Sequence, residues 1–140
     1  MKNTNCLVLL TFFCLFSAPA CKKYEDGPIL SLRTKKARLV GDWKISETFA
    51  NGLKLNGPIQ ITGLQIKKGG TFSFEYNTGY AGVKNGTWSL TNTKQYVDLS
   101  DSCCTERYKI LRLKNKELWL QNSLQQSATS TIELEYHFEQ

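Results

Sequence analysis

The sequence contains a single histidine among its 140 residues, and this scarcity limits the chemistry that the protein can perform. A catalytic triad needs a histidine that a third group orients toward a nucleophile. His137 instead stands between Glu135 and Glu139 on the polar face of a predicted strand, where we interpret it as a solvated surface residue. Beyond the adjacent pair Cys103-Cys104, no residues have the spacing of a metal site, and none have that of a phosphate-binding loop. We therefore expect a non-enzymatic protein that binds no metal and no cofactor.

Proline and helical periodicity are also scarce. The chain has three prolines, the last at Pro58, and no amphipathic helix of about ten residues fits after Gly41. A mainly helical fold is therefore excluded. The net charge of +6 comes without the aromatic and basic motifs of nucleic-acid-binding proteins, so we expect no nucleic-acid partner. One basic cluster is either a membrane-facing patch or a solvated helix face; it comprises Arg33, Lys35, Lys36 and Arg38.

The only long apolar run lies at the N terminus. After Lys2, residues 7–16 are apolar except for Thr11. A helix of that length spans about 15 Å, half of the hydrocarbon core of a bilayer, so it is too short for a permanent transmembrane helix. A basic start, a short apolar core and a small-residue stretch are typical of a secretory signal peptide. We expect residues 1–20 to be removed as a signal peptide.

Cys21 follows a run of small residues, Ser17-Ala18-Pro19-Ala20, and precedes a sharply polar segment. This arrangement resembles a bacterial lipobox, which implies that Cys21 is acylated and becomes the new N terminus. The alternative is ordinary cleavage after Ala20, which would leave an exposed and reactive thiol. Residues 21–33 contain Gly27-Pro28 and are predicted to form a lipid-anchored tether.

The remaining cysteines form one adjacent pair. Of the five cysteines, Cys6 and Cys14 leave with the signal peptide and Cys21 carries lipid, so Cys103 and Cys104 are left. An exported protein meets an oxidising compartment, which permits a disulfide. Adjacent cysteines bridge only through a strained ring. A vicinal disulfide, two free thiols, an intermolecular bridge and a structural loop without function therefore stay open.

Residues 34–140 predict a small all-β domain. Thr34 is expected to cap a short helix from Lys35 to Val40, which Gly41 ends. Beyond it, apolar and polar residues alternate with period two, as in half-buried strands, and the alternation shifts at Gly63 as at a bulge. Short turns predict an antiparallel meander, which protects its edges best by closing into a barrel. Eight strands are predicted, at 42–49, 58–67, 71–77, 86–92, 95–100, 106–114, 117–123 and 130–139.

Large aromatic residues alternate along several of these strands and are expected to face the barrel interior. An eight-stranded barrel is wide enough for side chains or for one small ligand. The aromatic residues therefore either line a ligand cavity or fill the core. The candidate cavity residues are Trp43, Phe72, Phe74, Tyr76, Trp88 and Tyr136.

The entry to the first strand resembles that of lipocalins, in which Gly-x-Trp follows a short helix; here the motif is Gly41-Asp42-Trp43. Together with the tether Cys21-Lys22-Lys23-Tyr24-Glu25-Asp26-Gly27-Pro28, the pattern is similar to the lipocalin-like lipoproteins of Bacteroidota. The resemblance implies an eight-stranded barrel with Trp43 closing one end. It also implies a lipid anchor in the outer membrane, with the charges after Cys21 favouring the cell surface. Lipocalins place an arginine near the last strand; residues 124–140 contain none, and Arg38 is the candidate substitute over Trp43.

Two functions follow from this interpretation. The first, implied by the resemblance, is an envelope lipoprotein whose barrel binds a small hydrophobic ligand. The alternative is a non-enzymatic interaction, accessory or inhibitor module on the envelope, which would use the loops at 77–82 or 100–105. The expected partners are the membrane, through the N-terminal lipid, and either the ligand or an envelope protein.

Overall fold

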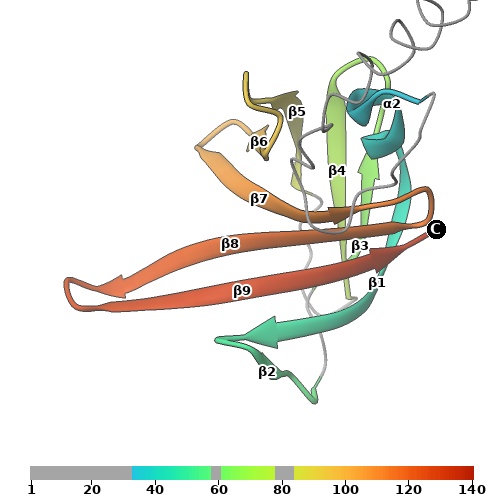
Figure 1. The fold of residues 1–140 in the computed structure, drawn as a ribbon. Helices are drawn as coiled ribbons and strands as arrows, with labels where there is room; N and C mark the ends of the chain where they lie inside the picture. Colours follow the sequence, from blue (N-terminus) through green and yellow to red (C-terminus); the bar gives the residue numbers. More distant parts are fainter. Residues whose placement is uncertain (1–32, 58–60, 78–83) are drawn as a thin grey trace, which may run out of the picture.

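The computed structural model describes residues 33–57, 61–77 and 84–140. The predicted signal peptide, Cys21 and all but the last residue of the tether lie outside these residues. No helix in the described part of the chain is long and apolar enough to cross a membrane. The elements are α2 (Lys35–Leu39), β1 (Gly41–Ala50), β2 (Leu53–Lys54), β3 (Ile61–Ile66), β4 (Thr71–Tyr76), β5 (Lys84–Leu90), β6 (Tyr96–Ser100), β7 (Thr105–Leu113), β8 (Glu117–Ser127) and β9 (Ser130–Glu139) (Figure 1).

The strands form one antiparallel sheet that closes on itself. Each strand from β3 to β8 pairs with the next along the chain, and β1 pairs with both β3 and β9. The predicted all-β meander and eight-stranded barrel are therefore confirmed. The short β2 adds a ninth strand beside β1 and was not predicted, because it has only two residues and Leu53 is 75% exposed.

The short helix closes one end of the barrel. The predicted cap is confirmed, since Thr34 Oγ1 accepts a hydrogen bond from the Ala37 N–H at 3.1 Å. The helix ends at Leu39, one residue before the predicted end at Val40, because Val40 is already extended and Gly41 begins β1. Trp43 Nε1 donates to the Leu39 carbonyl at 2.9 Å. Arg38, also buried, donates from Nη1 to the Leu113 carbonyl of β7 at 2.8 Å.

Irregular pairing decides which side chains enter the barrel. The register of β3 and β4 shifts between Ile61 and Gly63, which confirms the predicted bulge. A shift that was not predicted lies in β1, between Ile45 and Glu47. It reverses the alternation, so that Thr48 is buried while Glu47 and Phe49 are only half-buried. A bulge has this effect because one strand supplies an extra residue against its partner.

Strands β7 and β8 separate at the end of the barrel opposite the helix. Pairing of β7 with β8 ends at Lys109 and Gln121, whereas β8 and β9 stay paired as far as Ser127 and Ser130. The β8–β9 hairpin therefore extends beyond the barrel, as Figure 1 shows. Beyond Gln121, the backbone of β8 pairs only with β9 among the described strands.

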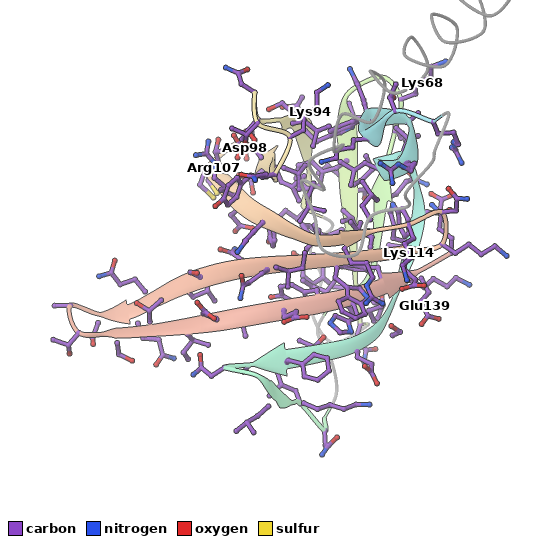
Figure 2. The ribbon with its side chains drawn as sticks, viewed as in Figure 1. Lys68, Lys94, Asp98, Arg107, Lys114 and Glu139 are labelled. Carbon is purple, nitrogen blue, oxygen red and sulfur yellow. The ribbon has the colours of Figure 1, made fainter. Side chains whose placement is uncertain are left out.

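The outer face carries an aromatic stack that corrects one expectation. His137 is 9% exposed rather than solvated. Its ring stacks on Trp119 with centroids 3.9 Å apart and lies 4.8 Å from the Phe49 ring, while Arg112 covers the far face of Trp119 at 3.7 Å. The covering residues come from β1, β7 and β8, so alternation within β9 could not reveal them. Elsewhere the outer face is polar: Asp98 and Arg107 form a two-pronged ion pair at 2.7 and 2.9 Å (Figure 2).

Candidate functional site

Charged and hydroxyl groups meet in the barrel at the end opposite the helix. Lys84 of β5 lies 2.6 Å from Glu106 Oε1 of β7, and Tyr108 donates from its hydroxyl to Glu106 Oε2 at 2.7 Å. Glu106 points inward because it stands two residues before Tyr108, which is 4% exposed. The side chains of Lys84 and Glu106 are 21% and 32% exposed. This is an ion pair at the rim of an apolar interior.

Three tyrosines surround this ion pair. The rings of Tyr108 and Tyr136 lie 6.4 Å apart, and the ring of Phe74 lies 6.3 Å from those of Tyr76 and Tyr108. Burial, reinforced by the hydrogen bond to Glu106, raises the pKa of Tyr108. Burial also raises the pKa of Tyr136 and of Tyr76. The three phenols therefore stay protonated at neutral pH and can donate hydrogen bonds.

Thr48 adds a hydroxyl without a partner. It lies opposite Tyr136 in the β1–β9 pairing and is 4% exposed. Its Oγ1 atom finds no hydrogen-bond partner among the described residues. A buried polar group left unsatisfied costs about 1–3 kcal/mol, and native proteins rarely contain one without a reason. Among the described residues, the Thr48 hydroxyl is therefore open to a further hydrogen-bond partner.

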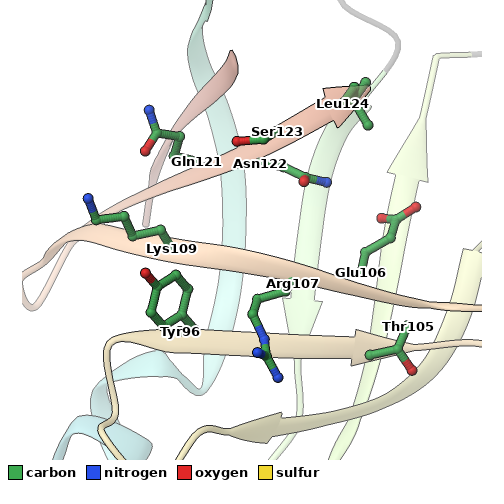
Figure 3. Close-up of a pocket in the computed structure, with 9 residues that line it drawn as sticks. All are labelled: Tyr96, Thr105, Glu106, Arg107, Lys109, Gln121, Asn122, Ser123 and Leu124. Atoms are coloured by element: carbon green, nitrogen blue, oxygen red, sulfur yellow. The ribbon is translucent and has the colours of Figure 1, made fainter. Parts of the chain in front are cut away.

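Close to this cluster, β7 and β8 diverge, because their pairing ends at Lys109 and Gln121. A cleft of about 530 Å³ lies there, with Glu106 and Asn122 among its walls, and the Asn122 side chain also hydrogen-bonds Tyr108. In Figure 3, Glu106 and Arg107 leave β7 on opposite sides. Glu106 and Asn122 are the lining residues that also belong to the polar cluster, whereas Arg107 and Lys109 are exposed on the outer face of β7. The cleft is lined by Tyr96, Thr105, Glu106, Arg107, Lys109, Gln121, Asn122, Ser123 and Leu124.

The six predicted cavity residues all belong to or pack on one core, but they do not form one site. Trp43 and Trp88 lie toward the helix, and the indole of Trp88 donates to the Lys67 carbonyl at 2.9 Å. A second cleft of about 590 Å³ borders Trp88 from outside, with Lys36 lying 5.7 Å over the indole ring. Phe72 and Phe74 are buried midway and meet edge to face, 5.7 Å apart. Tyr76 and Tyr136, both half-buried, lie beside the polar cluster, and the Phe74 ring lies 6.3 Å from that of Tyr108.

The polar members of the cluster were not predicted as site residues. On β7 and β8, the side chains that face the barrel interior alternate with those that face outward. Buried Ile110 and Leu120 show which positions face inward, and these positions include Glu106, Tyr108 and Asn122. Thr48 could not be found in this way, because the shift between Ile45 and Glu47 reverses the phase of β1.

Cys103 and Cys104 lie in the exposed turn between β6 and β7. Their sulfurs are 3.1 Å apart and both are free thiols, so the vicinal disulfide stays a prediction. The Asp101 carboxylate accepts a hydrogen bond from the Cys103 thiol at 3.0 Å, which raises the pKa of Cys103 to about 12. The same bond, with two backbone N–H donors, holds the pKa of Asp101 well below its usual range. Asp101 Oδ2 lies 3.4 Å from Lys84, which connects the turn to the polar cluster.

Comparison with known proteins supports the fold. No family model and no curated protein sequence matches this chain. Among solved structures, the bovine lipocalin allergen Bos d 2 is similar with a TM-score of 0.50 and 11% identity, over 76% of this chain and 75% of that one. A deswapped triple mutant of bovine odorant-binding protein has a TM-score of 0.48 and 18% identity, over 74% of each chain. A complex of bovine odorant-binding protein with a selenium-containing odorant has a TM-score of 0.48 and 17% identity, over 81% and 76%. The similarity to the lipocalin allergen supports a lipocalin-like fold for the barrel.

Proposed function

We propose that the barrel binds one small, mainly apolar molecule whose polar group enters the cluster of Thr48, Glu106 and Tyr108. The observation that carries this proposal is the buried Thr48 hydroxyl, which has no partner among the described residues. Ligand sites are typically apolar cavities with a few convergent polar groups. The proposed route of entry is the cleft between β7 and β8, which Glu106 and Asn122 help to line.

The charges of the cluster favour a neutral polar group on the ligand. Lys84 and Glu106 already pair at 2.6 Å, so a charged ligand would have to break this pair or bury an uncompensated charge. A hydroxyl, carbonyl or amide needs only hydrogen bonds, which Thr48 and the protonated tyrosines can supply. The apolar part of the ligand would lie against Phe74 and Tyr136.

The first test is titration with N-phenyl-1-naphthylamine, a neutral apolar fluorophore with one N–H group. We expect saturable binding of one molecule per chain. Glu106→Gln, which disrupts the cluster, should weaken binding several-fold. Glu75→Gln is the matched control, because it makes the same change at an exposed position of β4. Absence of saturable binding, or equal affinity of the two variants, would refute the proposed site, and mass spectrometry of natively purified protein would identify the natural ligand.

We further propose that the protein is an envelope lipoprotein, exported and held at the outer membrane by acylated Cys21, with the barrel facing the cell surface. The support is the apolar run at 7–16, the small residues before Cys21 and the polar tether after it. A metabolic fatty-acid label should tag the protein, and Cys21→Ala should abolish the tag. A tag that persists in this variant would place the lipid elsewhere. Protease accessibility in intact cells tests the orientation.

The open edge of β8 favours a second candidate, an interaction module that takes an extended strand of an envelope protein. Residues 122–127 of β8 lack a second neighbour among the described strands, and Leu124 is 46% exposed. Edge strands are usually protected by charge or proline, and the segment 121–132 contains neither. Cross-linking from position 124 in intact cells should capture such a partner, and Gln125→Pro should abolish the capture. Cross-links unchanged by Gln125→Pro would exclude strand addition.

A further inference from the structure

The turn between β6 and β7 holds three soft or anionic groups in a fixed arrangement. Ser100 and Thr105 pair at the ends of the two strands, and their hydroxyls lie 2.8 Å apart. Asp101 N–H donates to the Cys104 carbonyl at 3.0 Å and closes the turn. The backbone N–H groups of Cys103 and Cys104 both donate to Asp101 Oδ1, at 2.8 and 2.9 Å. The carboxylate and the two thiols are therefore positioned by backbone contacts.

The spacing of these groups is close to that of ligands around one metal ion. The ligand atoms of Asp101, Cys103 and Cys104 all lie within 4.8 Å of one another. The two sulfurs are 3.1 Å apart. Around a tetrahedral zinc with Zn–S bonds of about 2.3 Å, two sulfurs lie about 3.8 Å apart. A small outward rotation of either thiol reaches that separation.

A disulfide fits the same turn less well. It needs the sulfurs about 2.05 Å apart, and it normally joins α-carbons separated by at least about 4.4 Å. Consecutive residues hold their α-carbons at about 3.8 Å. A disulfide also gains no bond from the neighbouring Asp101 carboxylate. Here the Cys103 thiol donates to Asp101 at 3.0 Å. A cation that replaces this proton would be coordinated by the sulfur and the carboxylate oxygen at once.

We propose that Asp101, Cys103 and Cys104 form a binding site for a soft divalent cation of the zinc and cadmium class. Two thiolates and one carboxylate select such an ion over calcium or magnesium, which prefer oxygen ligands. The three anionic ligands and the cation together carry one negative charge, and Lys84, which also pairs with Glu106, lies 3.4 Å from Asp101 Oδ2 and partly offsets it. Binding releases the two thiol protons, so the affinity rises with pH. Both cysteines are exposed, which leaves a fourth coordination position for water.

The test uses the full chain in detergent with Cys6→Ser, Cys14→Ser and Cys21→Ser, so that only the adjacent pair can bind. Reduced protein is titrated with Cd²⁺ while the ultraviolet thiolate-to-cadmium absorption and the proton release are recorded. We expect one Cd²⁺ and about two protons per chain. Zn²⁺ should displace the absorption band in competition. Cys103→Ser and Cys104→Ser should each abolish the band.

The Asp101→Asn variant distinguishes a three-ligand metal site from a pair of thiols that binds the cation without the carboxylate. The amide oxygen can still accept from the backbone N–H groups, so the turn is kept, and circular dichroism checks the fold. We expect the affinity for Cd²⁺ to fall at least about tenfold, with the stoichiometry unchanged. Ser102→Ala, in the same turn, is the control and should bind as the parent does. Equal affinity of Asp101→Asn and the parent, or no band in the reduced parent, would overturn the proposal, which is independent of ligand binding in the barrel.

Discussion

Thr48→Val is expected to stabilise the ligand-free protein, although it removes a polar group from a strand. Thr48 is 4% exposed and its hydroxyl has no partner among the described residues. An unsatisfied buried hydroxyl costs about 1–3 kcal/mol. Valine has nearly the same shape without that cost and suits a strand at least as well. The free energy of unfolding should therefore rise by about 1 kcal/mol or more, which corresponds to about 4 °C or more in Tm for a domain of this size.

The assay is urea unfolding followed by tryptophan fluorescence, on protein stripped of bound small molecules. Thr87→Val makes the same change at an exposed position of β5 and should alter stability by less than about 0.5 kcal/mol. Thr48→Val should also weaken binding of the naphthylamine probe, so that stability and affinity change in opposite directions. Loss of about 1 kcal/mol or more in Thr48→Val would refute the reasoning, because it would mean that the hydroxyl is satisfied in the native protein.

Three further predictions concern the core and its ends. Burial raises the pKa of Tyr108 above the unfolded value of about 10, so the phenol loses its proton first in the unfolded state. The free energy of unfolding should therefore fall above about pH 10, by as much as about 1.4 kcal/mol per pH unit. Tyr108→Phe should flatten this slope in urea unfolding measured at alkaline pH. Phe74→Ala removes a ring that is 2% exposed and should cost about 3–5 kcal/mol, measured by calorimetry. Arg38→Met removes the hydrogen bond to the Leu113 carbonyl and should cost about 1–3 kcal/mol in urea unfolding, whereas an unchanged midpoint would mean that the helix does not stabilise the barrel.

Local pattern was sufficient for the strands and for the helix cap. Alternation in residues 130–139 matched β9, and Thr34 capped the helix as its side chain predicts. β8 was predicted to end at residue 123 but extends to Ser127, because its second half is polar except for Leu124 and has no alternation of apolar and polar residues. Its pairing with β9 holds it in the extended conformation.

The candidate site was harder to predict because it depends on contacts between strands. The aromatic residues of the interior were predicted from alternation, whereas the inward turn of Thr48 depends on a register shift against β9 that no pattern in β1 announces. His137 was misjudged for a related reason: Trp119 covers it from the neighbouring strand. The ion pair of Lys84 and Glu106 likewise joins two strands. Alternation along each strand shows which face of the sheet a residue takes, but it does not show which residues of the two strands meet.

The pairing of β1 with β9, the seam that closes the barrel, also sets the order in which the domain can fold. Across it, Ser46 donates to the His137 carbonyl over a separation of 91 residues. The hairpins from β3 to β9 can form from nearby segments, but the seam needs the first and the last strand together, and closing so long a loop is slow. Until the final strand has been synthesised, β1 and β8 each lack a neighbour. A nascent or truncated chain that ends before β9 therefore remains an open sheet, exposed to proteases and to pairing with other unfinished chains.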